Sequence, residues 1–102
     1  MNYEWDQTKN LENIRKHKVS FEQAKIVLED PYRLCFYDEA HSLNEDRYIV
    51  IGSAERRILF LSILWVDEDT IRIISARCAN RNEMEAYNET CALYFGKRTK
   101  PH

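Results

Sequence analysis

Residues 57–66 constrain the fold more than any other segment, because they are apolar on both faces of an extended chain. Apolar side chains occupy both sets of alternating positions: Ile58, Phe60 and Leu64 on one face, and Leu59, Leu61, Ile63 and Trp65 on the other. A strand that is buried on both faces lies in the interior of a sheet. The sequence therefore predicts a sheet in which this segment is a central strand.

Three further segments have the β-branched and aromatic character of strands. They are residues 33–37, 47–53 and 70–76, connected by a polar loop at 38–46 and short turns at 54–56 and 67–69. Short connections favour antiparallel neighbours, so we expect the four strands to form a meander. Ahead of them, Tyr3 and Trp5 alternate with polar residues and suggest a short extended segment.

Capping residues predict two helices before the sheet. Asp6 is suited to cap a helix over residues 7–17, and Ser20 with Gln23 has the spacing of a capping box for a helix over 21–29. Each helix is expected to turn apolar residues toward the sheet.

In the first helix this apolar stripe is Leu11 and Ile14. A third helix follows the sheet, where Asn80 and Glu83 have the spacing of a cap. It is expected to reach about residue 95, because Gly96 is suited to end a helix.

These elements define an α+β fold with two N-terminal helices, a four-stranded antiparallel sheet and a C-terminal helix. A chain of 102 residues has room for one domain. We assign residues 1–96 to that domain and residues 97–102 to a basic tail.

The overall charge argues mildly against a nucleic-acid binder, because 15 basic against 17 acidic residues give a net charge of −2. The charges are segregated, however. Acidic residues concentrate at 38–46 and 67–69, and basic residues at 9–18, 72–81 and 97–100. A nucleic-acid site would therefore be a local patch.

The three cysteines, Cys35, Cys78 and Cys91, are widely spaced and indicate neither a disulfide framework nor a metal site. We expect a cytoplasmic protein, since the N-terminus has no secretory pattern and no apolar run reaches the roughly 20 residues of a membrane helix. No cofactor is expected either, because no Gly-rich phosphate loop, GxSxG or HExxH motif is present.

His17 and His41 are the candidate titratable groups. His17 lies in the basic run 15–18, which is either a solvated helix end that complements the helix dipole or a phosphate-attracting patch. His41 lies in the polar loop shortly before Arg47. Loops held by a rigid sheet commonly carry catalytic residues, although exposed loop histidines without such a role are also ordinary.

Arg72 and Arg77 occupy positions of opposite parity in the last strand, so they are expected on opposite sheet faces. A partly buried arginine needs an acidic partner or an anionic ligand. Arg77, at the strand end and close to Arg81, is the better candidate for an anion site.

Together these residues suggest phosphate chemistry. Arginines would stabilise a pentavalent phosphate while a histidine moves a proton to or from a ribose oxygen, which is what RNA cleavage through the 2′-hydroxyl requires.

Several segments in the same order resemble one protein family. They are residues 3–6 with Lys9, Asn13, Lys16 and His17; residues 19–24 with Asp30 and Pro31; residues 38–42 with Arg47, Ile51 and Gly52; and residues 71–77 with Ala79, Arg81, Glu83 and Tyr87. In this combination the chain resembles BrnT, a ribonuclease toxin family of bacterial type II toxin–antitoxin systems.

The resemblance implies a RelE-like fold and a ribonuclease that inhibits translation by cutting RNA. It also implies a BrnA-like antitoxin, a ribbon-helix-helix protein through which the pair binds operator DNA and represses its own operon. Matching of polar positions favours His41 ahead of His17 as the acid–base group, with Arg47 and Arg77 on the phosphate. Further RNA contacts are expected from four basic residues: Lys9, Lys16, Arg72 and Arg81.

Two other functions are compatible with the same residues. The first is a binding module that has the same fold but no catalytic activity, and that acts through its antitoxin or as a transcriptional co-regulator. The second is a small structural protein. Incubation with total RNA separates the nuclease from the non-catalytic module.

Overall fold

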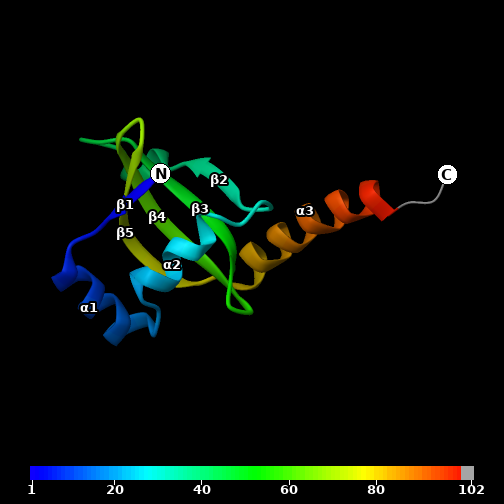
Figure 1. Cartoon of the computed structure of the whole chain (residues 1–102), viewed down its shortest axis with the longest axis horizontal. Coiled ribbons are helices and arrows are strands. Elements are labelled where there is room, and N and C mark those ends of the chain that lie inside the picture. The colour runs from blue at the N-terminus through cyan, green and yellow to red at the C-terminus, as the bar shows by residue number, and fades with distance from the viewer. Residues whose placement is uncertain (100–102) are drawn as a thin grey trace.

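The apolar segment predicted to be central is the middle strand of the sheet. The structure is a computed structural model that describes residues 1–99, and its strands lie in the order β1-β5-β4-β3-β2 (Figure 1). Their bounds are β1 Asn2–Glu4, β2 Leu34–Tyr37, β3 Arg47–Ala54, β4 Arg57–Asp67 and β5 Thr70–Cys78. The strands β2 to β5 form the expected antiparallel meander.

The prediction of a four-stranded antiparallel sheet is wrong at one edge, because the sheet has five strands and is mixed. The strand β1 runs parallel to β5, with Asn2 opposite Thr70 and Glu4 opposite Arg72. Three residues are too few for an alternating pattern to identify a strand, and the partner lies at the other end of the domain's sequence. Pairing covers part of the β5 edge that would otherwise be open.

The described residues contain three α-helices besides the sheet: α1 Gln7–His17, α2 Phe21–Val27 and α3 Arg81–Thr99. The predicted caps are present, with Asp6 accepting from the backbone N–H groups at the start of α1 and a complete Ser20–Gln23 capping box on α2. Figure 1 shows α2 against the sheet, α1 beside the β5 end and α3 leading away from the body. None of the helices described is long and apolar enough to cross a bilayer.

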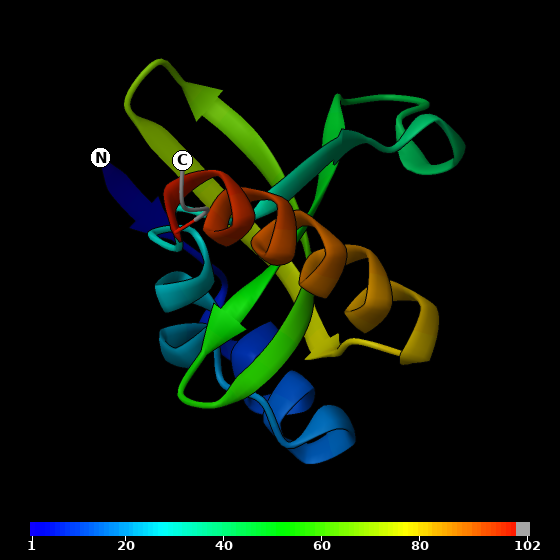
Figure 2. The same cartoon turned by 90° about the vertical axis from the view of Figure 1, so that its right-hand side faces the viewer.

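The C-terminal helix differs from the prediction because it continues past Gly96 to Thr99. Figure 2 shows it projecting from the sheet toward the viewer. Its first turns are anchored, since the buried Tyr87 donates a hydrogen bond from its hydroxyl to the carboxylate of Asp30. A helical glycine costs only about 1 kcal/mol relative to alanine, so it does not by itself end a helix.

Close approach of α2 to the sheet requires the glycine at position 52. A Cβ atom built there would lie 2.8 Å from Cγ1 of Val27 and 3.1 Å from Oδ2 of Asp30. The same carboxylate oxygen accepts the backbone N–H of Ser53 at 2.8 Å. Asp30, which follows α2, therefore connects this helix to β3 and, through Tyr87, to α3.

The predicted apolar stripe of α1 is wrong. Leu11 is 59% and Ile14 is 38% exposed, whereas the buried residues of this helix are Asn10 and Asn13. The helix does not bury an apolar face because it lies at the edge of the sheet, where unpaired backbone groups of β5 need hydrogen-bond partners.

Asn13 supplies those partners. Its side-chain oxygen accepts the N–H of Ala76 at 3.2 Å, and its side-chain nitrogen donates to the carbonyl oxygens of Ala76 at 2.7 Å and Val19 at 2.8 Å. Asn10 accepts the N–H of Phe21 at 2.8 Å. The two amides thus fix α1 to β5 and to the start of α2.

We predict that Asn13→Ala lowers the free energy of unfolding by about 2 kcal/mol, because it leaves buried backbone groups unpaired. Asn13→Asp lowers it further at neutral pH, since a carboxylate then faces two carbonyl oxygens. The loss for Asn13→Asp should shrink as the pH falls and the carboxyl becomes protonated. Urea unfolding at neutral and acidic pH measures both effects, and the exposed Asn44→Ala is the control. Equal stability of Asn13→Ala and the control would contradict the conclusion that the Asn13 amide stabilises the fold by pairing buried backbone groups.

Candidate active site

A cavity of about 350 Å³ opens on the sheet face opposite the core. Its floor residues, Ile49, Phe60 and Ser62, alternate along β3 and β4 with core residues such as Val50 and Leu61. Its remaining lining residues are Asp38, His41, Arg47, Ser75 and Arg77. The cavity, called the site cavity below, therefore contains three of the four residues predicted to be catalytic.

The loop that carries His41 is closed by hydrogen bonds at both ends. The N–H of Asp38 donates to the carbonyl of Arg47 at 2.9 Å, and the Ser42 hydroxyl accepts the N–H of Arg47 at 3.0 Å. Residues Glu39–His41 form one turn of 3₁₀ helix (η1) between these points. The loop thus holds His41 at the rim of the site cavity.

His41 is oriented by a carboxylate. Its Nδ1 lies 3.0 Å from Oδ2 of Asp38, whose side chain is only 11% exposed, while the His41 side chain is 69% exposed. Pairing of Nδ1 with a carboxylate fixes the ring and leaves Nε2 available for a substrate. This arrangement suits a group that moves protons.

The guanidinium group of Arg77 is fixed by two neighbouring side chains, Glu83 and Phe60. Its guanidinium makes two hydrogen bonds to the carboxylate of Glu83, at 2.8 and 2.9 Å, and its Cζ lies 3.9 Å from the centre of the Phe60 ring. The bidentate pair with Arg77 is the main cause that lowers the pKa of Glu83. Burial acts in the opposite direction, and the hydrogen bond from the Asn80 N–H lowers the pKa further. Glu83 is therefore the acidic partner that a partly buried Arg77 requires.

The second arginine of the site cavity is also paired with a glutamate, but through one carboxylate oxygen. Nε and Nη2 of Arg47 lie 3.3 and 3.1 Å from one carboxylate oxygen of Glu45. Each arginine of the cavity thus has its own carboxylate, Arg47 with Glu45 and Arg77 with Glu83, and His41 is hydrogen-bonded to a third, that of Asp38. The positive charge of the two arginines is consequently offset by neighbouring carboxylates.

A β-bulge corrects the prediction that Arg72 and Arg77 lie on opposite faces. Ser62 of β4 pairs with Ser75, but the next residue, Ile63, pairs with Ile73, so residue 74 is an extra residue in β5. The bulge shifts the alternation by one position, and both arginines lie on the face away from the core. The sequence pattern could not reveal this insertion.

The other predicted site residues lie outside the site cavity. Lys9, Lys16 and His17 line a second cavity of about 290 Å³ beside α1, together with Glu12, Asn13, Ile74 and Ser75. We call this the α1 cavity. His17 and His41 therefore belong to different cavities and do not form a catalytic pair in this structure.

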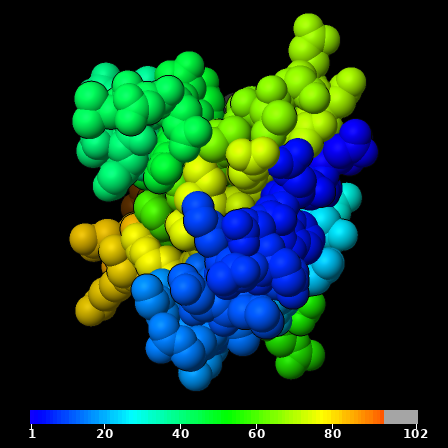
Figure 3. Space-filling view, turned by 90° about the vertical axis from the view of Figure 1, so that its left-hand side faces the viewer, coloured from blue at the N-terminus to red at the C-terminus, as the bar shows by residue number. Residues whose placement is uncertain are grey.

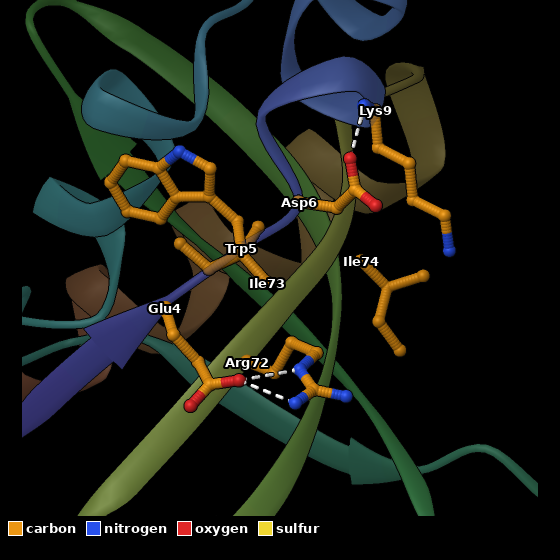
Figure 4. Close-up of a pocket in the computed structure, with 7 residues that line it drawn as sticks. All are labelled: Glu4, Trp5, Asp6, Lys9, Arg72, Ile73 and Ile74. Atoms are coloured by element: carbon orange, nitrogen blue, oxygen red, sulfur yellow. Dashed lines mark hydrogen bonds and ion pairs between the residues drawn. The ribbon is translucent and has the colours of Figure 1, made fainter.

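Arg72 and Arg81 are each engaged elsewhere. Arg72 lines a third cavity, of about 360 Å³, where its Nε donates to Glu4 at 2.7 Å across the β1–β5 pair (Figure 4). Arg81 lies on the first turn of α3, almost fully exposed, with Nε 3.5 Å from Glu85.

Sequence reasoning missed the carboxylates that organise the site cavity. Glu83 was identified as a helix cap, and it does cap α3 with Asn80, but its second role toward Arg77 had no sequence signal. Asp38 lies three residues before His41, a spacing at which a short helical turn brings two side chains together. That spacing was the available signal for the pair.

The structure is thus a small α+β protein with a histidine, hydrogen-bonded to a carboxylate, and two arginines on one exposed sheet face. Such a set of groups can transfer a proton and stabilise charge on a phosphate. A family model described as "Ribonuclease toxin, BrnT, of type II toxin-antitoxin system" matches residues 5–83. The chain belongs to this BrnT family of ribonuclease toxins. The match ends within the first turn of α3, at the residue that binds Arg77.

The fold is similar to a solved member of the family. The crystal structure of the ribonuclease toxin BrnT from Brucella abortus matches with a TM-score of 0.64 and 26% sequence identity, over 79% of this chain and 99% of that chain. A search of curated proteins finds no match.

We predict that Glu83→Gln lowers the free energy of unfolding by about 1 kcal/mol at pH 7, because the charged partner of the half-exposed Arg77 is lost. The pKa of Glu83 is lowered by folding, so its contribution is complete above the unfolded pKa and is lost as the pH falls through the folded one. Urea unfolding across acidic pH should show the two proteins converging.

The matched control is Glu85→Gln, which removes a carboxylate from an exposed pair two residues further along α3. It should leave stability nearly unchanged. A difference between Glu83→Gln and the parent protein that persists in acid would contradict the ion-pair explanation.

Proposed function

We propose that this protein is a ribonuclease that cleaves RNA through the 2′-hydroxyl, with His41, Arg47 and Arg77 as its catalytic residues. The observation that supports this most directly is the site cavity itself. It joins a histidine fixed by Asp38 to two arginines, beside apolar side chains on an open sheet face.

In this mechanism Nε2 of His41 takes the proton of the 2′-hydroxyl. The 2′-oxygen then forms a bond to phosphorus, and the bond from phosphorus to the 5′-oxygen breaks. The 5′-oxygen takes up a proton from solvent, so the products are a 2′,3′-cyclic phosphate and a 5′-hydroxyl. Arg47 and Arg77 stabilise the negative charge that develops on the phosphate oxygens, which makes the proposed reaction independent of a metal ion.

The two glutamates set the geometry of those arginines before RNA binds. Glu83 and Phe60 hold the Arg77 guanidinium in one plane, and Glu45 holds Arg47 through one edge. A guanidinium has five N–H donors, so one that is bound to a carboxylate keeps donors for a phosphate.

The cellular role follows from the family and from the resemblance noted in the sequence. We propose a cytoplasmic toxin with a RelE-like fold that inhibits translation and is neutralised by a BrnA-like ribbon-helix-helix antitoxin. Through that antitoxin the pair would bind operator DNA. Free Cys35, Cys78 and Cys91 are consistent with a reducing compartment. Lys9, Lys16, Arg72 and Arg81 are proposed to contact RNA outside the site cavity.

We predict that His41→Ala lowers kcat on single-stranded RNA by about 10²- to 10⁴-fold, as expected for loss of a general base. Added imidazole should restore part of the rate. Arg47→Ala and Arg77→Ala should also lower kcat, whereas Arg56→Ala, which removes an arginine from the β3–β4 turn, should not. Cleavage is followed by gel electrophoresis in the presence of EDTA.

A 2′-deoxy substitution at the cleaved nucleotide should abolish cleavage, and the product should end in a 2′,3′-cyclic phosphate. Intact RNA with the folded parent protein would refute the catalytic proposal and favour the non-catalytic module. Normal cleavage by His41→Ala would leave a nuclease but overturn the assignment of the base.

A further inference from the structure

The three cavities on the outer side of β5 are contiguous. Ser75 lines both the site cavity and the α1 cavity, while Lys9 and Ile74 line both the α1 cavity and the cavity that holds Arg72. Figure 3 shows this face, with the surface of β5 in yellow running between the loop at 38–46 in green and α1 in blue. The site cavity therefore adjoins the α1 cavity at Ser75, and we call the surface from His41 along β5 to α1 the path.

Positive charge without a partner is found at the α1 end of this path. In the site cavity each arginine is paired with a glutamate, as described above. The ammonium groups of Lys9 and Lys16 make no ion pair with any residue whose side chain the structure describes, and Glu12 is the one carboxylate of the α1 cavity. Figure 4 shows the Lys9 side chain ending beside Ile74, apart from the Glu4–Arg72 pair.

The floor of the path contains apolar side chains, and its wall is fixed by hydrogen bonds. Ile49 and Phe60 lie in the site cavity and Ile74, at the bulge, lies in the α1 cavity. The wall formed by α1 is held to β5 by the two-way hydrogen bonds between Asn13 and Ala76. Apolar surface beside cations is the pattern that accommodates unpaired bases next to a phosphate backbone. A duplex keeps its bases stacked and does not present them to such a floor.

We propose that the site cavity and the α1 cavity form one groove for single-stranded RNA, in which Lys9, Lys16 and His17 hold phosphates next to the cleaved one. This inference rests on the proposed ribonuclease function. It moves His17 from the catalytic group to the phosphate-binding group. It also explains how a catalytic cavity whose arginines are offset by carboxylates recruits a polyanion, because attraction comes from the neighbouring part of the groove.

The test is a binding measurement that does not depend on cleavage. Fluorescence anisotropy is measured with a labelled 2′-O-methyl oligonucleotide of about ten nucleotides, which cannot be cut because its 2′-oxygens are blocked. The same oligonucleotide annealed to its complement, and a dinucleotide, are measured alongside. The variant is Lys9→Ala/Lys16→Ala. Its matched control is Lys25→Ala/Arg56→Ala, which removes the same charge from α2 and the β3–β4 turn.

The lysine variant should bind the single strand about tenfold more weakly than the control. The slope of log K against log salt should fall by about 1.4, at about 0.7 for each phosphate that a lysine no longer neutralises. The effect should be smaller for the dinucleotide, which does not reach both cavities, and the duplex should bind more weakly than the single strand.

Equal binding by the lysine variant and its control would overturn the groove, as would a duplex that binds as tightly as the single strand. These results are distinct from failure of the proposed function. A parent protein that binds through the lysines but cuts no RNA supports the groove and refutes the nuclease. A parent protein that cuts RNA, with binding that is unchanged in the lysine variant, supports the nuclease and refutes the groove.

Discussion

The hydrogen bonds of the Asn13 amide to both backbone groups of Ala76 determine where α1 lies, and the outer side of β5 depends on that position. The strand β1 pairs with β5 only at residues 70–72, and further along the strand the amide of α1 takes the place of a neighbouring strand. A buried amide in a low-dielectric setting is stable only when its donors and acceptors are paired, so the helix has little freedom to shift. This explains why α1 buries amides and leaves Leu11 and Ile14 exposed.

The candidate active site is organised by carboxylates from different parts of the chain. Asp38 and Glu45 come from the loop before β3, while Glu83 comes from the first turn of α3. The hydrogen bond from Tyr87, one turn further along, to Asp30 anchors the start of α3. Burial together with this carboxylate raises the pKa of the Tyr87 hydroxyl. The start of α3 thereby belongs to the site, whereas the helix beyond it projects from the body.

The slightly acidic composition and the family's activity on RNA are reconciled by the distribution of charge. Carboxylates that position His41, Arg47 and Arg77 contribute to the net charge of −2. Basic residues of α1 lie on the same face of the molecule as those pairs, at the other end of the path along β5. Net charge is a sum over the chain, but a ligand responds to the local potential.

The sequence by itself determined the central strand, the meander, the helix caps and the residues of the site cavity that carry positive charge. These follow from alternation, from capping spacings and from the chemistry of histidine and arginine, all of which are local in the chain. Only the tertiary structure decided the parallel β1 strand, the bulge at Ile74 and the partners of Arg77 and Asn13. Each of these depends on groups that are distant in sequence, or on a residue inserted into a strand. The alternation of apolar and polar residues along the chain carries no information about such contacts. For the same reason the sequence could not show that its two candidate histidines, His41 and His17, line different cavities, which meet at Ser75.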